Sequence, residues 1–128
     1  MRLLLDTHAF VWLDIAKNKL SEVAQEAITN PENEVYFSLT SVWEMQIKFH
    51  LGKLHLNTSL KETLVRQQES NGIQLLPIQL NHILALNNLP QHHRDPFDRL
   101  LIAQAHSEDL TLVTNDTKIR LYDVHTMW

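Results

Sequence analysis

The sequence predicts an α/β fold with a mainly parallel sheet of about five strands. Short apolar or β-branched runs alternate with longer segments of helical periodicity along the whole chain, a pattern that favours parallel strands joined by helices. The length of 128 residues fits one domain, so residues 1–128 are expected to form a single unit. Because crossovers between parallel strands are right-handed, helices are expected on both faces of the sheet.

Five segments have the composition of strands, and the first of them is expected to be buried. Residues 1–5 form an apolar run closed by Asp6, and residues 34–38 are rich in β-branched and aromatic side chains. The same reasoning places strands at residues 73–78 and 110–113, with a last candidate at residues 122–127.

Six helices are predicted between these strands, several of them with recognisable ends. Ser21 and the pair Asp95-Pro96 are typical of helix starts, whereas a glycine or a proline marks three helix ends. The helices are expected at residues 8–15, from Ser21 to the turn at 30–33, at 40–51 before Gly52, at 59–71 before Gly72, at 80–89 before Pro90, and at 95–108.

The composition excludes several classes of site. There are no cysteines, which excludes disulfides, thiolate metal sites and a cysteine nucleophile. Only two glycines occur, both at helix ends, so the chain has no glycine-rich phosphate loop. The net charge of −4 is not that of a basic nucleic-acid carrier. No signal sequence and no apolar run of roughly 18 residues is present, so a cytoplasmic protein without a membrane partner is expected.

Two acids follow predicted strands directly. Asp6 comes after the first strand, and Asp116 follows the strand at residues 110–113 by a short step through Asn115. Ligands bind at the carboxyl ends of strands in open α/β sheets, so both side chains are expected at one functional edge. For either acid alone, a turn or helix cap is the commoner role.

Two further acids lie on predicted helices. Asp95 is expected to cap its helix, whereas Asp98 opens the apolar stripe of Leu101, Ile102 and Ala105 and is therefore expected to face the strand ends. Glu44 borders a stripe with Ile47 and Leu51, although an ion pair with Lys48 is the simpler interpretation for this residue alone.

The four carboxylates together predict a metal site. Like charges gathered in one pocket repel each other and raise their pKa values, and a fold tolerates them when a cation relieves the repulsion. Carboxylate and water oxygens suit Mg²⁺ or Mn²⁺, which activate water and offset charge on a phosphodiester. Asp6, Glu44, Asp98 and Asp116 are therefore the candidate catalytic and metal-binding residues.

Four segments of the chain resemble the PIN-domain nucleases, especially the VapC-type toxins of bacterial toxin–antitoxin pairs. In order they are LLLDTH (residues 3–8), SLTSVWE (38–44), HRDPFDRLLIAQA (93–105) and LVTND (112–116). They have the family's order and spacing and span almost the whole chain.

The resemblance implies a three-layer α/β/α sandwich and a ribonuclease that hydrolyses single-stranded or loop RNA with Mg²⁺ or Mn²⁺. It carries the family ligands over to Asp6, Glu44, Asp98 and Asp116. It also implies a homodimer and a small cognate antitoxin that inserts a basic side chain into the acidic pocket. Supporting roles fall to Thr7 and Thr114, and to Asp95 as cap or outer-shell group.

Two other functions remain as alternatives. A different Mg²⁺-dependent phosphoryl-transfer hydrolase is one, although a haloacid-dehalogenase-type phosphatase needs an acid at the position of His8. A non-catalytic PIN-fold module that binds proteins is the other, and the presence of all four acids argues against it.

The aromatic and histidine residues allow more than one interpretation. Trp12 and Trp43 lie among apolar residues and are expected in the core, although tryptophans also stack on bases. The eight histidines include no zinc-binding spacing. His8 and His93 adjoin the acidic motifs, where contact with RNA and a packing role both remain open.

Overall fold

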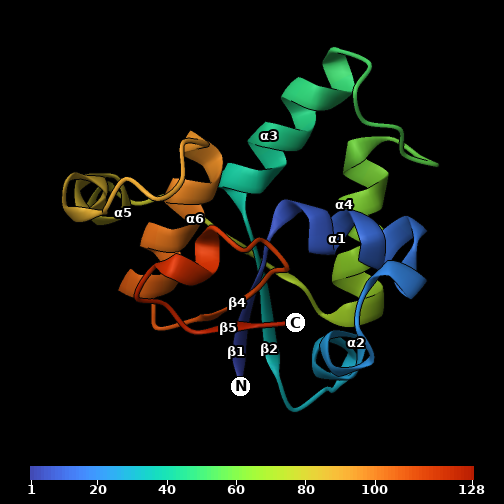
Figure 1. Ribbon diagram of the computed structural model, residues 1–128. Coiled ribbons are helices and arrows are strands. Elements are labelled where there is room, and N and C mark those ends of the chain that lie inside the picture. The colour runs from blue at the N-terminus through green and yellow to red at the C-terminus, as the bar shows by residue number, and fades with distance from the viewer.

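The computed structural model describes all 128 residues and contains one five-stranded sheet in which all neighbouring strands are parallel (Figure 1). The order is β3-β2-β1-β4-β5, so the chain first runs outward from β1 on one side and then returns to its other side. The strand order therefore reverses between β1 and β4. The strands are β1 (Arg2–Leu5), β2 (Glu34–Ser38), β3 (Gln74–Leu76), β4 (Thr111–Val113) and β5 (Thr126–Met127).

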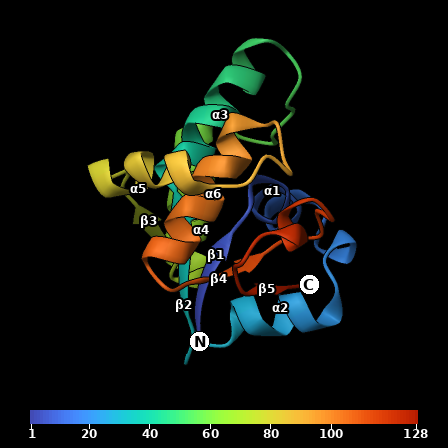
Figure 2. The same ribbon diagram turned by 60° about the vertical axis from the view of Figure 1, so that its left-hand side comes forward.

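Helices cover both faces of this sheet, which confirms the three-layer α/β/α architecture (Figures 1 and 2). Successive side chains of β1 point to opposite faces. Leu3 and Leu5 therefore belong to one core cluster, and Leu4 belongs to the other. The first cluster lies under α1 (Thr7–Ile15), α2 (Glu22–Thr29) and α4 (Leu60–Asn71), and the second under α6 (Pro96–Ser107), beside which α5 (Leu80–Ala85) packs.

The predicted helix ends are largely confirmed. The Ser21 hydroxyl accepts a hydrogen bond from the Ala24 N–H at 3.0 Å, and the Asp95 carboxylate accepts from the Phe97 N–H at 2.8 Å. Gly72 ends α4 in the left-handed conformation with φ of 63°. None of the helices is long and apolar enough to cross a lipid bilayer.

Three predictions were wrong in detail. The strand expected at residues 122–127 is limited to Thr126–Met127, because a 3₁₀ helix at Ile119–Leu121 and a bend precede it. The helix expected at residues 80–89 ends at Ala85 and continues as a 3₁₀ turn at Leu86–Asn88. Trp43 is 58% exposed rather than buried.

Trp43 lies on the exposed side of α3 (Leu39–His50), which it shares with Leu39 and Ile47. This helix starts at the carboxyl end of β2 and extends beyond the sheet, so its far half has little to pack against (Figures 1 and 2). Met45 reaches the core, whereas Ile47 and Leu51 are exposed. Periodicity along the helix identifies an apolar stripe but cannot tell how much of that stripe the sheet covers.

An ion pair between a buried carboxylate and a partly exposed arginine joins α1 to α4 on the first face of the sheet. The Asp14 side chain is 1% exposed and accepts hydrogen bonds from the Arg66 guanidinium at 2.9 and 3.0 Å and from Gln67 Nε2 at 2.9 Å. The Arg66 guanidinium also contacts the Thr58 hydroxyl. This network fixes α4 against the helix that follows β1.

Candidate active site

The structure brings the four predicted carboxylates to the carboxyl edge of the sheet, from four different elements. Asp6 follows β1, Asp116 follows β4, Glu44 lies on α3 and Asp98 lies in the first turn of α6. This edge includes the point where the strand order reverses, the usual ligand site of open α/β sheets.

Asp6 is buried and held at both carboxylate oxygens. It caps α1, because its Oδ1 accepts from the Ala9 N–H at 2.7 Å, and its Oδ2 accepts from the Thr114 hydroxyl at 2.6 Å. Burial raises the pKa of Asp6, and the hydrogen bonds from Thr114 and Ala9 offset only part of this effect. Asp6 is thus both the expected cap and a buried acid that costs free energy to ionise.

Glu44 is equally buried and lies against the segment that follows Asp6. The Thr7 hydroxyl donates to Glu44 Oε1 at 2.6 Å. Lys48 Nζ lies 3.0 Å from Oε2, so the predicted pairing one turn along α3 is present. Thr7 and Thr114, both predicted as supporting residues, thus each orient one buried carboxylate.

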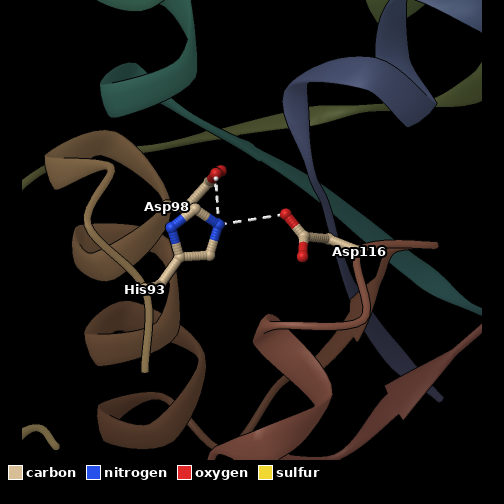
Figure 3. A group of neighbouring side chains, drawn as sticks. All are labelled: His93, Asp98 and Asp116. Carbon is tan, nitrogen blue, oxygen red and sulfur yellow. Dashed lines mark hydrogen bonds and ion pairs between the residues drawn. The ribbon is translucent and has the colours of Figure 1, made fainter. Parts of the chain in front are cut away.

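Asp98 and Asp116 approach each other across the edge and share one donor, His93 (Figure 3). His93 Nε2 lies 3.1 Å from Asp98 Oδ2 and 3.0 Å from Asp116 Oδ2. His93 Nδ1 accepts the Asp95 N–H at 3.1 Å. The neutral imidazole must therefore carry its proton on Nε2, where it can donate to the two carboxylates.

The electrostatics of these two acids differ. Burial and the neighbouring charges of Asp95, Glu44 and Asp6 raise the pKa of Asp98 to about 7, despite the opposing effect of His93. Burial would also raise the pKa of Asp116. There, however, the hydrogen bonds from His93 and the Lys118 N–H prevail and lower that pKa. Burial and neighbouring negative charges thus both disfavour the ionised form of Asp98.

The donor set fits a hard divalent cation. Of the four carboxylates, Asp98 and Asp116 lie close enough to share one ion, whereas Asp6 and Glu44 lie outside this group. Lys48 is the one lysine paired with any of the four acids. His93 is grouped in space with Asp98 and Asp116, within 4.8 Å, as a metal-binding cluster would be. Its Nε2, however, is a donor as long as Nδ1 accepts from Asp95, so the oxygen atoms are the fitting ligands.

A pocket of about 270 Å³ opens beside the carboxylates. Asp6 and Asp116 line it, together with His8, Trp12 and Asn115. Of these, Trp12 was expected in the core; it is instead half-buried and lines the pocket.

His93 is the site residue whose role the sequence did not reveal. The sequence shows that His93 lies next to the DPFD motif (residues 95–98). It does not show that His93 also contacts Asp116, which is 23 residues further along the chain. One local signal was available. His93 lies two residues before Asp95, which caps α6, so its Nδ1 can accept the Asp95 backbone N–H and leave the ring proton on Nε2.

Comparisons with known proteins agree with this geometry. The sequence model of the family described as "PIN domain" matches residues 3–124. The chain superposes on the crystal structure of VapBC2 from Rickettsia felis bound to a promoter DNA fragment, with TM-score 0.76, 16% identity and coverage of 99% of this chain and 98% of that chain.

Two other solved structures have the same fold. VapBC-1 from nontypeable Haemophilus influenzae matches with TM-score 0.69 and 19% identity, covering 99% of this chain and 97% of that chain. FitAcB from Neisseria gonorrhoeae matches with TM-score 0.63 and 22% identity, covering 98% and 96%. At these identities the likeness shows the fold. No curated protein matches the chain significantly.

Proposed function

The chain belongs to the PIN domain family, a family of nucleases, and from this premise we propose that it is a Mg²⁺- or Mn²⁺-dependent endoribonuclease, the toxin of a toxin–antitoxin pair. The observation that carries the proposal is the convergence of Asp6, Glu44, Asp98 and Asp116 at the point where the strand order reverses. The solved VapBC structures with this fold support the assignment to a toxin.

The mechanism follows from how the chain holds these side chains. Asp6, Glu44, Asp98 and Asp116 would hold the ion directly or through water. When bound, the ion would activate a water for attack on the scissile phosphorus and offset charge on the phosphoryl oxygens. Thr114 and Thr7 each occupy one lone pair of a buried carboxylate and fix its orientation, leaving other lone pairs free. Asp95 acts as the cap of α6, so it sets the position of Asp98 without needing to be a ligand.

The test is cleavage of a mixed pool of structured RNAs by purified protein with Mg²⁺, with Mn²⁺ and with EDTA. We expect cuts in single-stranded or loop segments that EDTA abolishes. Asp6→Asn should lose these cuts while the protein stays folded. Asp123→Asn, which removes an exposed acid outside the cluster, is the matched control and should cut as the wild type does.

The alternative is a PIN-fold module that binds proteins without catalysis. A folded protein, freed of any partner, that binds Mg²⁺ or Mn²⁺ but cuts no RNA would favour this alternative. Full cleavage by folded Asp6→Asn would instead reject the assignment of Asp6.

His93 provides a prediction about metal-free protein. Because its Nε2–H already relieves part of the repulsion between Asp98 and Asp116, His93→Ala should destabilise the metal-free protein by about 1–2 kcal/mol. Mg²⁺ should then raise the melting temperature of the variant more than that of the wild type, as measured by thermal denaturation with and without EDTA. Loss of the Mg²⁺-induced shift would show that His93 is itself a ligand.

We also propose that the protein forms a homodimer and binds a small antitoxin that reaches the acidic cluster with a basic side chain. The solved VapBC structures support an antitoxin partner. An exposed apolar stripe at intervals of four residues along α3 offers surface for a second copy: Leu39, Trp43, Ile47 and Leu51. Light scattering of the purified protein should give twice the mass of 14.9 kDa, and a Trp43→Glu variant should give the monomer mass.

A further inference from the structure

The pocket beside the carboxylates has two chemically different walls. Asp6 and Asp116 form the wall that it shares with the proposed metal site, and Trp12 and His8 form an aromatic wall. Its volume of about 270 Å³ lies just below the roughly 300–1,000 Å³ of pockets for drug-sized molecules. The pocket therefore suits one planar ring system lying directly next to the carboxylates.

The aromatic wall is firmly supported from behind. The Trp12 ring packs edge-on against Trp128 with centroids 5.6 Å apart, and both rings lie against the first core cluster. His8, one turn earlier on α1, is exposed, and its ring lies 5.7 Å from that of Trp12. Lys19 Nζ lies 6.0 Å from the Trp12 centroid and places a positive charge over that ring. A rigid indole with an imidazole and an ammonium nearby is typical of surfaces that stack nucleobases and contact phosphates.

Asn115 adds an uncharged polar group to the lining of the pocket. Asn115 is exposed between Thr114, which orients Asp6, and Asp116. The side-chain oxygen Oδ1 of Asn115 lies 3.5 Å from Arg120 Nη2, at the limit of a hydrogen bond. The side-chain amide of Asn115 is otherwise free to pair. An amide both donates and accepts, as recognition of a base edge requires.

We propose that this pocket binds the nucleobase adjacent to the scissile phosphate, with Trp12 and His8 stacking on the ring and Asn115 contacting its edge. The inference rests on the proposed function, because the shared residues Asp6 and Asp116 place the pocket next to the phosphate that would be cut. It assigns selection of the cleavage site to α1 and to the loop after β4. A base in this pocket must be unstacked from its neighbours, so single-stranded segments and loops are the accessible substrates.

The test compares two replacements of Trp12 that separate stacking from packing. Trp12→Leu keeps an apolar side chain against the core but removes the ring, whereas Trp12→Phe keeps a ring. Phe49→Leu changes an exposed aromatic residue outside the pocket and is the matched control. Binding is measured by fluorescence anisotropy with Ca²⁺ in an Asp98→Asn background. The probes are a short RNA spanning a cut site mapped in the wild type and the same RNA made abasic next to the cut.

We expect Trp12→Leu to weaken binding of the intact RNA at least about fivefold and to leave binding of the abasic RNA unchanged. Trp12→Phe should retain most of the affinity for the intact RNA, and Phe49→Leu should retain all of it. Asn115→Ala, in the active background, should broaden the set of bases found next to the cut. If circular dichroism shows that Trp12→Leu is unfolded, His8→Ala replaces it, because His8 is exposed. His8→Ala should weaken binding of the intact RNA and leave binding of the abasic RNA unchanged.

The outcomes separate this inference from the proposed function. Equal binding of intact RNA by the wild type and Trp12→Leu, or equal weakening of intact and abasic RNA, would overturn the base pocket. Absence of any metal-dependent cut by the wild type would overturn the proposed function instead, since no cut site could then be mapped.

Discussion

Asp98→Asn should abolish RNA cleavage and at the same time stabilise the metal-free protein. Burial, and after it the like charges of Asp95, Glu44 and Asp6, make ionisation of Asp98 unfavourable and raise its pKa. Removing its charge removes a proposed ligand, so cleavage should fall by at least about 100-fold. The same change relieves the repulsion, so the free energy of unfolding without metal should rise by about 1–2 kcal/mol at pH 8.

The pH dependence of the stability predicts the same stabilising direction for Asp98→Asn. With a folded-state pKa of about 7, Asp98 is protonated in the folded protein but ionised in the unfolded chain between roughly pH 4 and 7. The folded state binds the extra proton, so the stability that Asp98 contributes is present at low pH and is lost as the pH rises through about 7. Asp98→Asn should therefore differ from the wild type most at pH 8 and least near pH 4.

Thermal unfolding with EDTA at pH 4, 6 and 8 measures the difference in stability between Asp98→Asn and the wild type. A second series with Mg²⁺ measures how much the ion stabilises each protein. Mg²⁺ at 100 times its dissociation constant should stabilise the wild type by about 2.7 kcal/mol, and should stabilise Asp98→Asn much less. A metal-free variant that is less stable than the wild type at pH 8 would contradict the electrostatic account. Retained cleavage would contradict the role of Asp98 as a ligand.

Arg66→Met should cost about 3 kcal/mol of folding free energy, because it leaves the carboxylate of Asp14 buried without its charged partner. Gln67 still donates one hydrogen bond to Asp14, which limits the loss. Urea denaturation at pH 7 measures the effect. The double variant Arg66→Met, Asp14→Leu should recover much of the lost stability, since no unpaired buried charge remains.

The matched control for this prediction is Arg2→Met. Arg2 pairs with Glu34 on the surface, where both side chains are about half exposed, so the expected loss is no more than about 1 kcal/mol. Equal losses in Arg2→Met and Arg66→Met would show that burial of Asp14 has no special cost.

Much of the site's position could be predicted from local patterns. Asp6 follows an apolar run, and Asp98 opens the stripe of Leu101 and Ile102, so strand ends and helix faces bring both acids to the same edge. The sequence also predicted the pairing of Glu44 with Lys48, because residues four apart on a helix are neighbours wherever the helix lies.

The features that the sequence did not predict depend on distant parts of the chain. His93 bridges Asp98 and Asp116 only because α6 and the loop after β4 meet at the edge of the sheet. Trp43 and Trp12 have similar apolar neighbours in the sequence, yet Trp43 lies on the exposed side of α3, two residues before the buried Met45, whereas Trp12 packs against the first core cluster. Local periodicity does not show which side of a helix the rest of the chain will cover.

The strand order also determines when this site can exist during synthesis. Asp6 is synthesised before the rest of the site, but its backbone N–H bonds to Val113 and its carboxylate accepts from Thr114, 108 residues later in the chain. Until that segment is synthesised, β1 lacks its neighbour β4, and Asp116 is absent from the site. The nascent chain thus cannot assemble its carboxylate cluster before β4 and the loop after it have been translated, and the topology delays formation of the site until synthesis of the domain is nearly complete.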